Sequence, residues 1–201
     1  NNFGRKEAKG GYLLLLNNDT EMINDDCLNE LLSYTERDDV GITGARLLYE
    51  DNTVQHAGVV IGYNGLAGHT FVGNEPDDVG YRAYVIQARD YSAVPAACLM
   101  VKASLYDEVG GFEEELEVAF NDVDFCLKVR EKGYLVVYNP YAVLHHYESK
   151  SRGYEDTPEK RNRFEKEAFF TYNKWEKILA DGDPCYNPNL TLSNSDFSLR
   201  E

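Results

Sequence analysis

The chain has 201 residues, a length that favours one domain built around a single hydrophobic core. Hydrophobic residues make up 43% and aromatic residues 12%, a composition that excludes an intrinsically disordered chain. The formal net charge of -15 argues against binding to a nucleic-acid backbone, which needs a basic surface, so no nucleic-acid partner is expected.

Residues 12–20 hold the first predicted strand, a run of four leucines that leads into Asn17, Asn18 and Asp19. A short, unbroken apolar run is typical of a strand buried on both faces in the middle of a parallel sheet. Ligands of open α/β sheets bind at the carboxyl ends of strands. We therefore expect this polar tip to face a ligand-binding crevice, and a simple polar turn is the alternative.

Helices and strands alternate along the rest of the chain, which predicts an α/β fold. Helices are predicted over 24–37, 104–109, 121–132 and from 157 onward, and strands over 40–49, 53–63, 92–101, 134–138 and 142–147. The strands at 40–49 and 53–63 are expected to form a hairpin. Scattered glycines predict a long loop over 62–90, of the kind used as a lid or binding segment. Residues 181–201 are expected to form an extended arm of the domain that residues 1–180 make.

The helix predicted over 121–132 carries two acidic residues on different faces. Asp122 lies within the apolar arc of the helical wheel, whereas Asp124 lies in the opposite arc with the lysines. An inward carboxylate at a helix start either caps the first turn or acts as a general base in a partly desolvated cleft, and both alternatives stay open. Asp124 is expected to be a solvated charge or an orienting partner.

Histidines supply a second group of candidates. His145 and His146 end the last predicted strand, where alternation places them on opposite faces. A structural role is the commoner one, and metal binding is the alternative. Residues 149–153 follow with hydroxyls and two cations that could hold phosphate oxygens, or they form only a polar loop. His69, in the glycine-rich loop, could contact a substrate.

Six segments together resemble family-2 inverting glycosyltransferases of the GT-A fold, and within them the rhamnosyltransferase-like enzymes of bacterial surface polysaccharide synthesis. The segments are YLLLLNNDTE (12–21), TVQHAGV (53–59), AACLMV (96–101), VGGF (109–112), FNDVDFCL (120–127) and HYESKSRG (146–153). The resemblance implies a mixed, mainly parallel sheet flanked by helices. Family members begin with a βαβ unit ahead of the first strand, so we expect an N-terminally truncated domain that is inactive when isolated.

The resemblance also implies how the donor is held. Asp19 ends a DxD-type motif and would bind Mg²⁺ or Mn²⁺ bridging the sugar-nucleotide diphosphate, and His146, counted back from Ser151, matches a metal-proximal histidine. Four further residues are implied to contact the nucleotide sugar: Asn17, Asn18, Ser151 and Arg152.

On the acceptor side, Asp122 matches the family's general base, which deprotonates the acceptor hydroxyl for in-line attack with inversion. Asn121, where the family usually has Glu, and Asp124 belong to the same motif and are expected to contact the substrate. His69 is a further candidate for substrate binding.

The function implied is sugar transfer from a nucleoside-diphosphate sugar to a glycan or lipid-linked acceptor hydroxyl. Alternatives are a sugar nucleotidyltransferase and a non-catalytic carbohydrate-binding or assembly module. No apolar run reaches the ~20 residues that span a bilayer, and four scattered cysteines read as reduced core residues. We therefore expect a cytoplasmic protein, which in its full-length form could associate peripherally with the inner face of the membrane.

Overall fold

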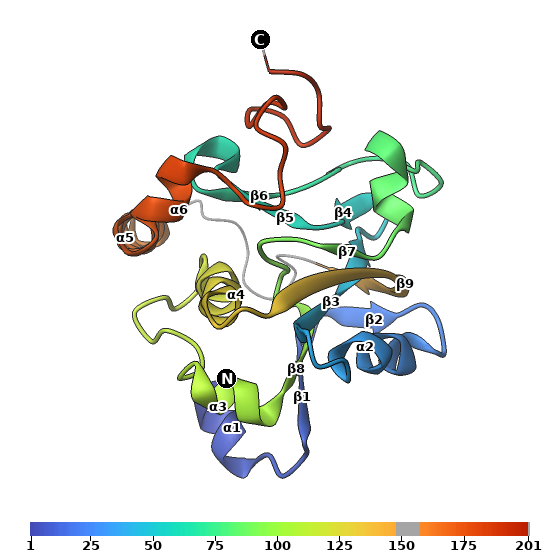
Figure 1. Cartoon of the computed structure of the whole chain (residues 1–201), viewed down its shortest axis with the longest axis vertical. Coiled ribbons are helices and arrows are strands. Elements are labelled where there is room, and N and C mark those ends of the chain that lie inside the picture. Colours follow the sequence, from blue (N-terminus) through green and yellow to red (C-terminus); the bar gives the residue numbers. More distant parts are fainter. Residues whose placement is uncertain (148–156, 201) are drawn as a thin grey trace.

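The computed structural model describes residues 1–147 and 157–200, and within them the main sheet has seven strands. Five follow one another in the order β1 (Tyr12–Leu16), β8 (Cys98–Lys102), β3 (Val40–Leu48), β9 (Leu135–His146) and β2 (Thr20–Met22). Off this path, β4 (Val54–His56) pairs with β3 and β7 (Arg89–Asp90) with β9. A separate two-stranded sheet joins β5 (Val59–Ile61) to β6 (Ala67–His69) and lies above the main sheet in Figure 1.

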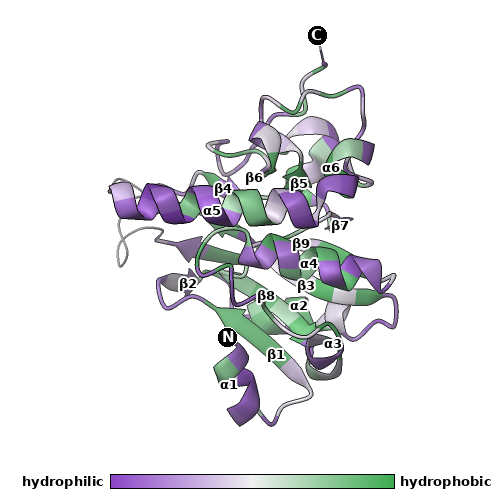
Figure 2. Ribbon diagram, turned by 90° about the vertical axis from the view of Figure 1, so that its left-hand side faces the viewer, coloured by the Kyte–Doolittle hydropathy of each residue, from purple (hydrophilic) through white to green (hydrophobic). Residues whose placement is uncertain are grey.

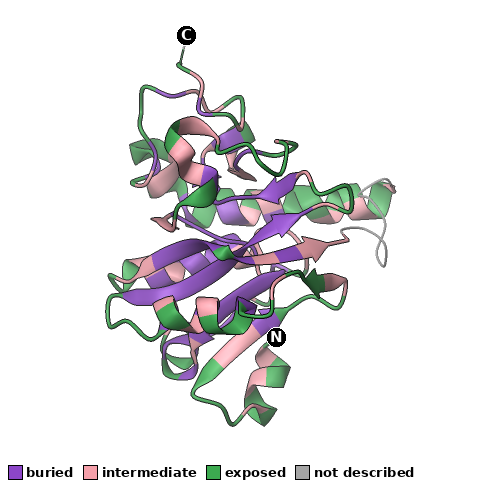
Figure 3. Ribbon diagram, turned by 90° about the vertical axis from the view of Figure 1, so that its right-hand side faces the viewer, coloured by how far each residue is buried: buried purple, intermediate pink, exposed green. Residues whose placement is uncertain are grey.

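Helices cover both faces of the main sheet. On one face, α2 (Cys27–Thr35) buries Cys27 and Leu31 against β3, β8 and β9, while Leu28 is 47% exposed. On the opposite face, α3 (Ala103–Glu108) and α4 (Asn121–Glu131) pack into a larger cluster (Figure 1). The central strands between these two layers are therefore buried, as Figure 3 shows.

The remaining elements surround this core. They are α1 (Asn2–Glu7), α5 (Pro158–Lys174), α6 (Glu176–Asp181) and the 3-10 helices η1 (Tyr63–Gly65) and η2 (Tyr81–Ile86). The Thr157 hydroxyl caps α5 by accepting from the Lys160 amide at 3.3 Å, so the predicted start of this helix is confirmed. Figure 2 shows α5 beside α4, coloured mainly as a hydrophilic helix. The predicted loop over 62–90 contains η1, β6, η2 and β7.

The sheet is mixed, but the prediction that it is mainly parallel is wrong for the described strands. Only β3 and β9 form a parallel pair there, whereas β8 lies antiparallel to both β1 and β3, and β2 antiparallel to β9. An apolar run shows that a strand is covered on its faces and says nothing about the direction of its neighbours. The predicted hairpin is confirmed for β3 and β4, an antiparallel pair with a bulge at Leu47/Leu48. The single strand predicted over 53–63 is wrong, because it divides into β4 and β5, and β5 belongs to the small sheet.

The first strand is also less buried than its four leucines predict. Among the described strands β1 lies at an edge of the sheet, with Tyr12 39% and Leu16 45% exposed. Leu15, which is 8% exposed, is the β1 residue that enters the core. The apolar run predicts the strand correctly, but the prediction that this strand lies in the middle of the sheet is wrong.

The two strands predicted around Asn139 and Pro140 form one strand, β9. Its parallel pairing with β3 passes from Asn139 opposite Ala45 to Val143 opposite Arg46, so the residues between them form a bulge. A bulge tolerates a proline, which cannot donate a ladder hydrogen bond. Pro140 considered alone predicts a break in the strand, but the pairing with β3 keeps β9 continuous.

Residues 182–200 lie against the small sheet. The Asp183 carboxylate accepts from the Ile61 amide at 2.7 Å and from the Ser92 hydroxyl at 2.6 Å. Tyr186, Leu190 and Phe197 join the larger core cluster. The end of the described chain thus carries its own buried anchors.

Two findings bear on membranes and redox state. None of the described helices combines the length and hydropathy that crossing a bilayer requires. Cys27, Cys98 and Cys126 are buried and free, as expected, and burial raises the pKa of Cys27 to about 11. These thiols are therefore protonated near neutral pH.

Gly58→Ala is expected to destabilise the fold by about 2–4 kcal/mol. Gly58 separates β4 from β5 with a φ of 120°, and an added Cβ would lie 2.4 Å from the Tyr91 ring. Gly65→Ala is the matched control, because Gly65 also has positive φ (90°) but no atom within 4 Å of an added Cβ. Urea unfolding should show a loss of only about 1 kcal/mol for the control. Equal losses in the two variants would contradict the steric explanation.

Candidate functional site

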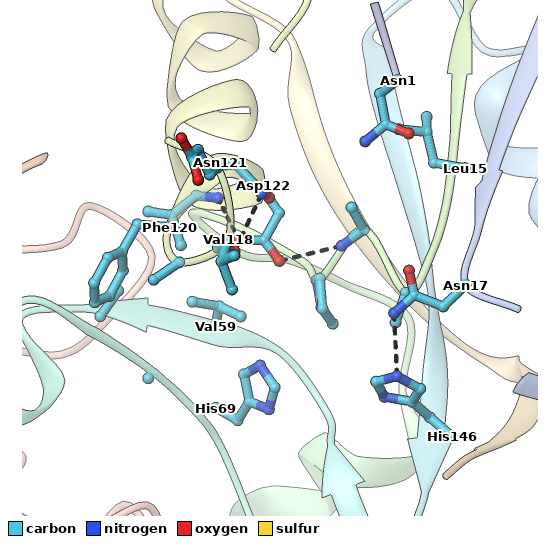
Figure 4. Close-up of a pocket in the computed structure, with 18 of the residues that line it drawn as sticks. Asn1, Leu15, Asn17, Val59, His69, Val118, Phe120, Asn121, Asp122 and His146 are labelled. Carbon is cyan, nitrogen blue, oxygen red and sulfur yellow. Dashed lines mark hydrogen bonds between the residues drawn. The ribbon is translucent and has the colours of Figure 1, made fainter. Parts of the chain in front are cut away.

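A cavity of about 490 Å³ opens beside the end of β1, where the sequence predicts a crevice (Figure 4). Its walls come from the end of β1, from β6, from residues 95–97, from the loop before α4 and from the end of β9. Five predicted site residues line it: Asn17, His69, Asn121, Asp122 and His146. Residues from distant parts of the chain thus meet at one cavity, but Asp19, the predicted metal ligand, is not among the residues that line it.

Asp122 lies in the first turn of α4 and faces the cavity. One carboxylate oxygen accepts from the Val123 amide at 2.8 Å and the other from the Ala96 amide at 3.2 Å. Burial raises the pKa of Asp122, while the charge of nearby His69 and the backbone N–H groups act in the opposite direction. A half-buried carboxylate with a raised pKa in a cavity suits a general base.

His69, on β6, lies on the opposite wall from Asp122 in Figure 4. Its Nδ1 is 3.2 Å from the carbonyl oxygen of Gln55. Because a carbonyl can only accept, this contact places a proton on Nδ1 and leaves Nε2 with a lone pair in the neutral ring. The two residues present polar atoms to the same space.

A second polar group lies at the end of β1. The Asn17 side-chain amide is 3.2 Å from Nε2 of His146, and the Asp19 carboxylate is 3.4 Å from the same nitrogen. Both side chains of the Asp19–His146 pair are largely buried, at 17% and 12% exposed. Strand pairing explains the meeting, because Thr20 of β2 lies opposite His146 of β9.

The neighbouring candidates lie elsewhere. Asn18 is exposed and does not line the cavity. His145 points to the other side of β9, with Nε2 2.8 Å from the Asn52 side-chain oxygen. Of the two adjacent histidines, His146 is therefore the one at the cavity. Ser151 and Arg152 lie outside the described residues.

The expectation that Asp124 is a solvated charge or contacts the substrate is wrong. Its side chain is 0% exposed, is absent from the cavity wall, and accepts from the indole N–H of Trp175 at 3.0 Å. Lys174 and Lys128 lie 2.8 and 3.2 Å from its oxygens. A helical wheel of α4 alone predicts that the face with Asp124 is exposed to solvent, because it cannot show that residues of α5 and Trp175 pack against that face. Asp124 fastens α4 to the C-terminal helices.

Sequence reasoning also missed Glu167, which is 3% exposed on α5. Its carboxylate accepts from the backbone amides of Glu117, Val118 and Ala119 at 3.1, 3.3 and 2.7 Å. These three residues form part of the cavity wall. The signal in the sequence was an acid three residues after Phe164 and four before Thr171 on the helix predicted from 157 onward. A buried carboxylate thus shapes the loop that leads into Asp122.

The group around Asp19 fits a divalent cation, although no cluster of three or more His, Cys, Asp or Glu suited to a metal occurs within residues 1–147 and 157–200. Two donor atoms 3.4 Å apart, Oδ1 of Asp19 and Nε2 of His146, can share one ion at the usual ~2.0–2.2 Å. Without a proton or a cation between them, a carboxylate and an imine lone pair repel. Mg²⁺ typically takes one or two carboxylates and completes its shell with water and substrate phosphates.

Comparison with known proteins agrees with this architecture. The chain is 47% identical over 200 residues to the uncharacterized protein y4gI of Sinorhizobium fredii, covering 99% of the chain and 22% of that protein. It is 37% identical over 204 residues to the O-antigen biosynthesis protein RfbC of Myxococcus xanthus, covering 100% of the chain and 15% of RfbC. A stretch of 57 residues is 37% identical to an N-acetylglucosaminyl-diphospho-decaprenol L-rhamnosyltransferase of Mycobacterium tuberculosis, covering 28% of the chain and 19% of that enzyme. No protein-family model matches the chain.

Two solved structures have similar folds. GalNAc-T7 with UDP, GalNAc and Mn²⁺ superposes with a TM-score of 0.63 at 13% identity, over 90% of this chain and 35% of that chain. The mannosyltransferase PcManGT from Pyrobaculum calidifontis with GDP-Man and Mn²⁺ gives 0.56 at 16% identity, over 88% and 42%. The chain therefore has the GT-A glycosyltransferase fold. Within that class it is related to the rhamnosyltransferase-like proteins of polysaccharide synthesis, as the sequence motifs predict.

Proposed function

We propose that the chain forms the metal-binding and acceptor-binding part of an inverting glycosyltransferase in bacterial surface polysaccharide synthesis. The observation that carries this proposal is the convergence of Asp122, His69, Asn17 and His146 on one cavity of about 490 Å³. The names of RfbC and of the rhamnosyltransferase support the pathway. The chain spans only 22% of y4gI and 15% of RfbC. The donor would be a nucleoside-diphosphate sugar and the acceptor a glycan or lipid-linked saccharide.

In this mechanism Asp122 accepts the proton of the acceptor hydroxyl while that oxygen bonds to the anomeric carbon of the donor. The bond between the anomeric carbon and the diphosphate oxygen breaks, and the diphosphate leaves with the bonding electron pair. Attack from the face opposite the leaving group inverts the anomeric centre. Burial keeps the base poorly solvated, and the Ala96 and Val123 amides fix its carboxylate.

Asp19 and His146 would hold Mg²⁺ or Mn²⁺, which supplies positive charge to the diphosphate. Asn17, on the cavity wall, would contact the donor, and Ser151 and Arg152 are proposed as further donor contacts, whereas Asn18 is exposed and away from the cavity. Asn121 and His69, on the cavity wall, would contact the acceptor. The buried free thiols agree with a reducing compartment, so we place the protein in the cytoplasm or at the inner face of the membrane.

Asp19→Ala is expected to weaken Mn²⁺-dependent nucleotide binding by at least about tenfold, because it removes one of two protein ligands. Calorimetric titration of UDP, GDP and dTDP, each with and without Mn²⁺, measures the effect. Asp25→Ala is the matched control, since Asp25 is an exposed aspartate a few residues further along. Nucleotide binding that is independent of Mn²⁺, or unchanged in the Asp19 variant, would contradict the metal site.

A further inference from the structure

A buried glutamine lies directly behind the proposed metal-binding histidine. Gln55 belongs to β4 and is 1% exposed. Its side-chain oxygen is 2.7 Å from Nδ1 of His146, and its side-chain nitrogen is 3.2 Å from the His146 carbonyl oxygen. One side chain therefore contacts both the ring and the backbone of His146, from a position 91 residues away in sequence.

These two contacts fix the position of a proton. A backbone carbonyl can only accept, so the amide group that faces it must be the NH₂ of Gln55. The amide oxygen then faces Nδ1, and this short contact is a hydrogen bond only if Nδ1 carries the proton. In the neutral ring Nε2 keeps its lone pair, which accepts from the Asn17 side-chain NH₂ at 3.2 Å and lies 3.4 Å from Asp19, so a bound cation would replace the Asn17 contact.

We infer that Gln55 is a positioning residue, which holds His146 in the Nδ1–H tautomer and so presents the Nε2 lone pair to a divalent cation beside Asp19. The tautomer of His146 follows from the Gln55 contacts alone, whereas the divalent cation rests on the proposed function. A ring with its proton on Nε2 would instead donate to Asp19 and close the site to a cation. Partners that orient a metal-binding histidine in this way typically contribute ten- to hundredfold to metal affinity.

His145, the adjacent histidine, gives the contrast. Its contact to an amide oxygen is through Nε2, at 2.8 Å from Asn52, and it points away from the cavity. That pair resembles the Gln55–His146 pair in chemistry, since each joins an imidazole to a side-chain amide. It differs in lying outside the Asp19 group. Because Asn52 has a φ of 69°, Asn52→Gly is the matched control for loss of an amide–imidazole contact without added backbone strain.

Gln55→Met tests the inference, because methionine is unbranched, similar in length and lacks the amide oxygen and NH₂. Gln55→Glu is the rescue variant, since a carboxylate oxygen still accepts from Nδ1–H. Two measurements on the 201-residue chain are needed: the ¹⁵N shifts of the His146 ring in metal-free protein, and the affinity for Mn²⁺ alone by electron paramagnetic resonance titration. Circular dichroism melting curves show whether each variant folds.

Both the wild-type protein and Gln55→Glu are expected to show a protonated Nδ1. The Mn²⁺ affinity of Gln55→Glu should equal or exceed that of the wild-type protein. Gln55→Met should shift the ring toward Nε2–H and weaken Mn²⁺ binding ten- to hundredfold, whereas Asn52→Gly should leave both unchanged. An Nδ1–H ring and unchanged Mn²⁺ affinity in Gln55→Met would overturn the inference. If the wild-type chain binds no Mn²⁺, the cation role is overturned, whereas the transferase function is judged separately by the Asp122 variant.

Discussion

Asp122→Asn in the full-length protein is expected to lower kcat by about 10²–10⁴-fold while the affinity for the nucleoside-diphosphate sugar stays nearly unchanged. The amide cannot accept the acceptor proton, but it keeps the size of the side chain and its hydrogen-bond acceptor for the Ala96 or Val123 amide. Steady-state kinetics with donor and acceptor varied separately, together with direct donor titration, measure the two effects.

The pH profile adds a second readout. Asp122 works as a base only when ionised, so activity is present above its pKa and is lost as the pH falls through it. Burial raises this pKa above the ordinary 3.8, and the acidic limb of kcat/KM should therefore lie at a higher pH than an exposed aspartate would give. The Asn variant should lack that limb.

Glu131→Gln is the matched control, because Glu131 is an exposed carboxylate on the same helix. It makes the same carboxylate-to-amide change without touching the cavity, and wild-type kinetics are expected. Wild-type rates in the Asp122 variant would instead favour the non-catalytic carbohydrate-binding or assembly module.

The sequence predicts those features of this site that depend on the periodicity of a single helix or strand. The inward position of Asp122 could be read from the apolar arc of one helix, and the opposite faces of His145 and His146 from strand alternation. Both patterns depend only on the period of a single element. The structure places Asp122 at the cavity accordingly, whereas the choice of His146 over His145 came from the family resemblance and not from alternation.

What escaped prediction depends on contacts between elements. Asp124 was assigned to the wet face because a wheel cannot include the helix that covers it, and Trp175 lies 51 positions away in sequence. No pattern in the sequence links Gln55 to His146, or Glu167 to the loop before α4. The same holds for β1, whose neighbours in the sheet no local pattern reveals. Pairing and packing partners decide these positions.

Asp124→Ala is expected to cost about 3 kcal/mol of unfolding free energy, near the lower end of the range for breaking a buried ion pair. The change leaves the Trp175 indole N–H and two ammonium groups without their shared carboxylate. The lower end applies because Lys174 is 29% exposed and keeps Glu113 at 3.0 Å. Burial by itself would lower the pKa of Lys174, yet its bonds to Asp124 and Glu113 raise it, which indicates that the pair is favourable.

Urea unfolding measures this loss, and for a chain of this size about 3 kcal/mol corresponds to a fall in Tm of about 6–12 °C. Asp107→Ala is the matched control, since its carboxylate is 53% exposed and its ion pair with Arg5, at 2.6 Å, should contribute at most about 1 kcal/mol. Asp124→Asn should lose less than Asp124→Ala, because the amide oxygen still accepts from Trp175. If both Asp124 variants lost no more unfolding free energy than the Asp107 control, the contacts of Asp124 would not be what holds α4 in place. The position of Asp122 would then depend on Glu167 and the sheet.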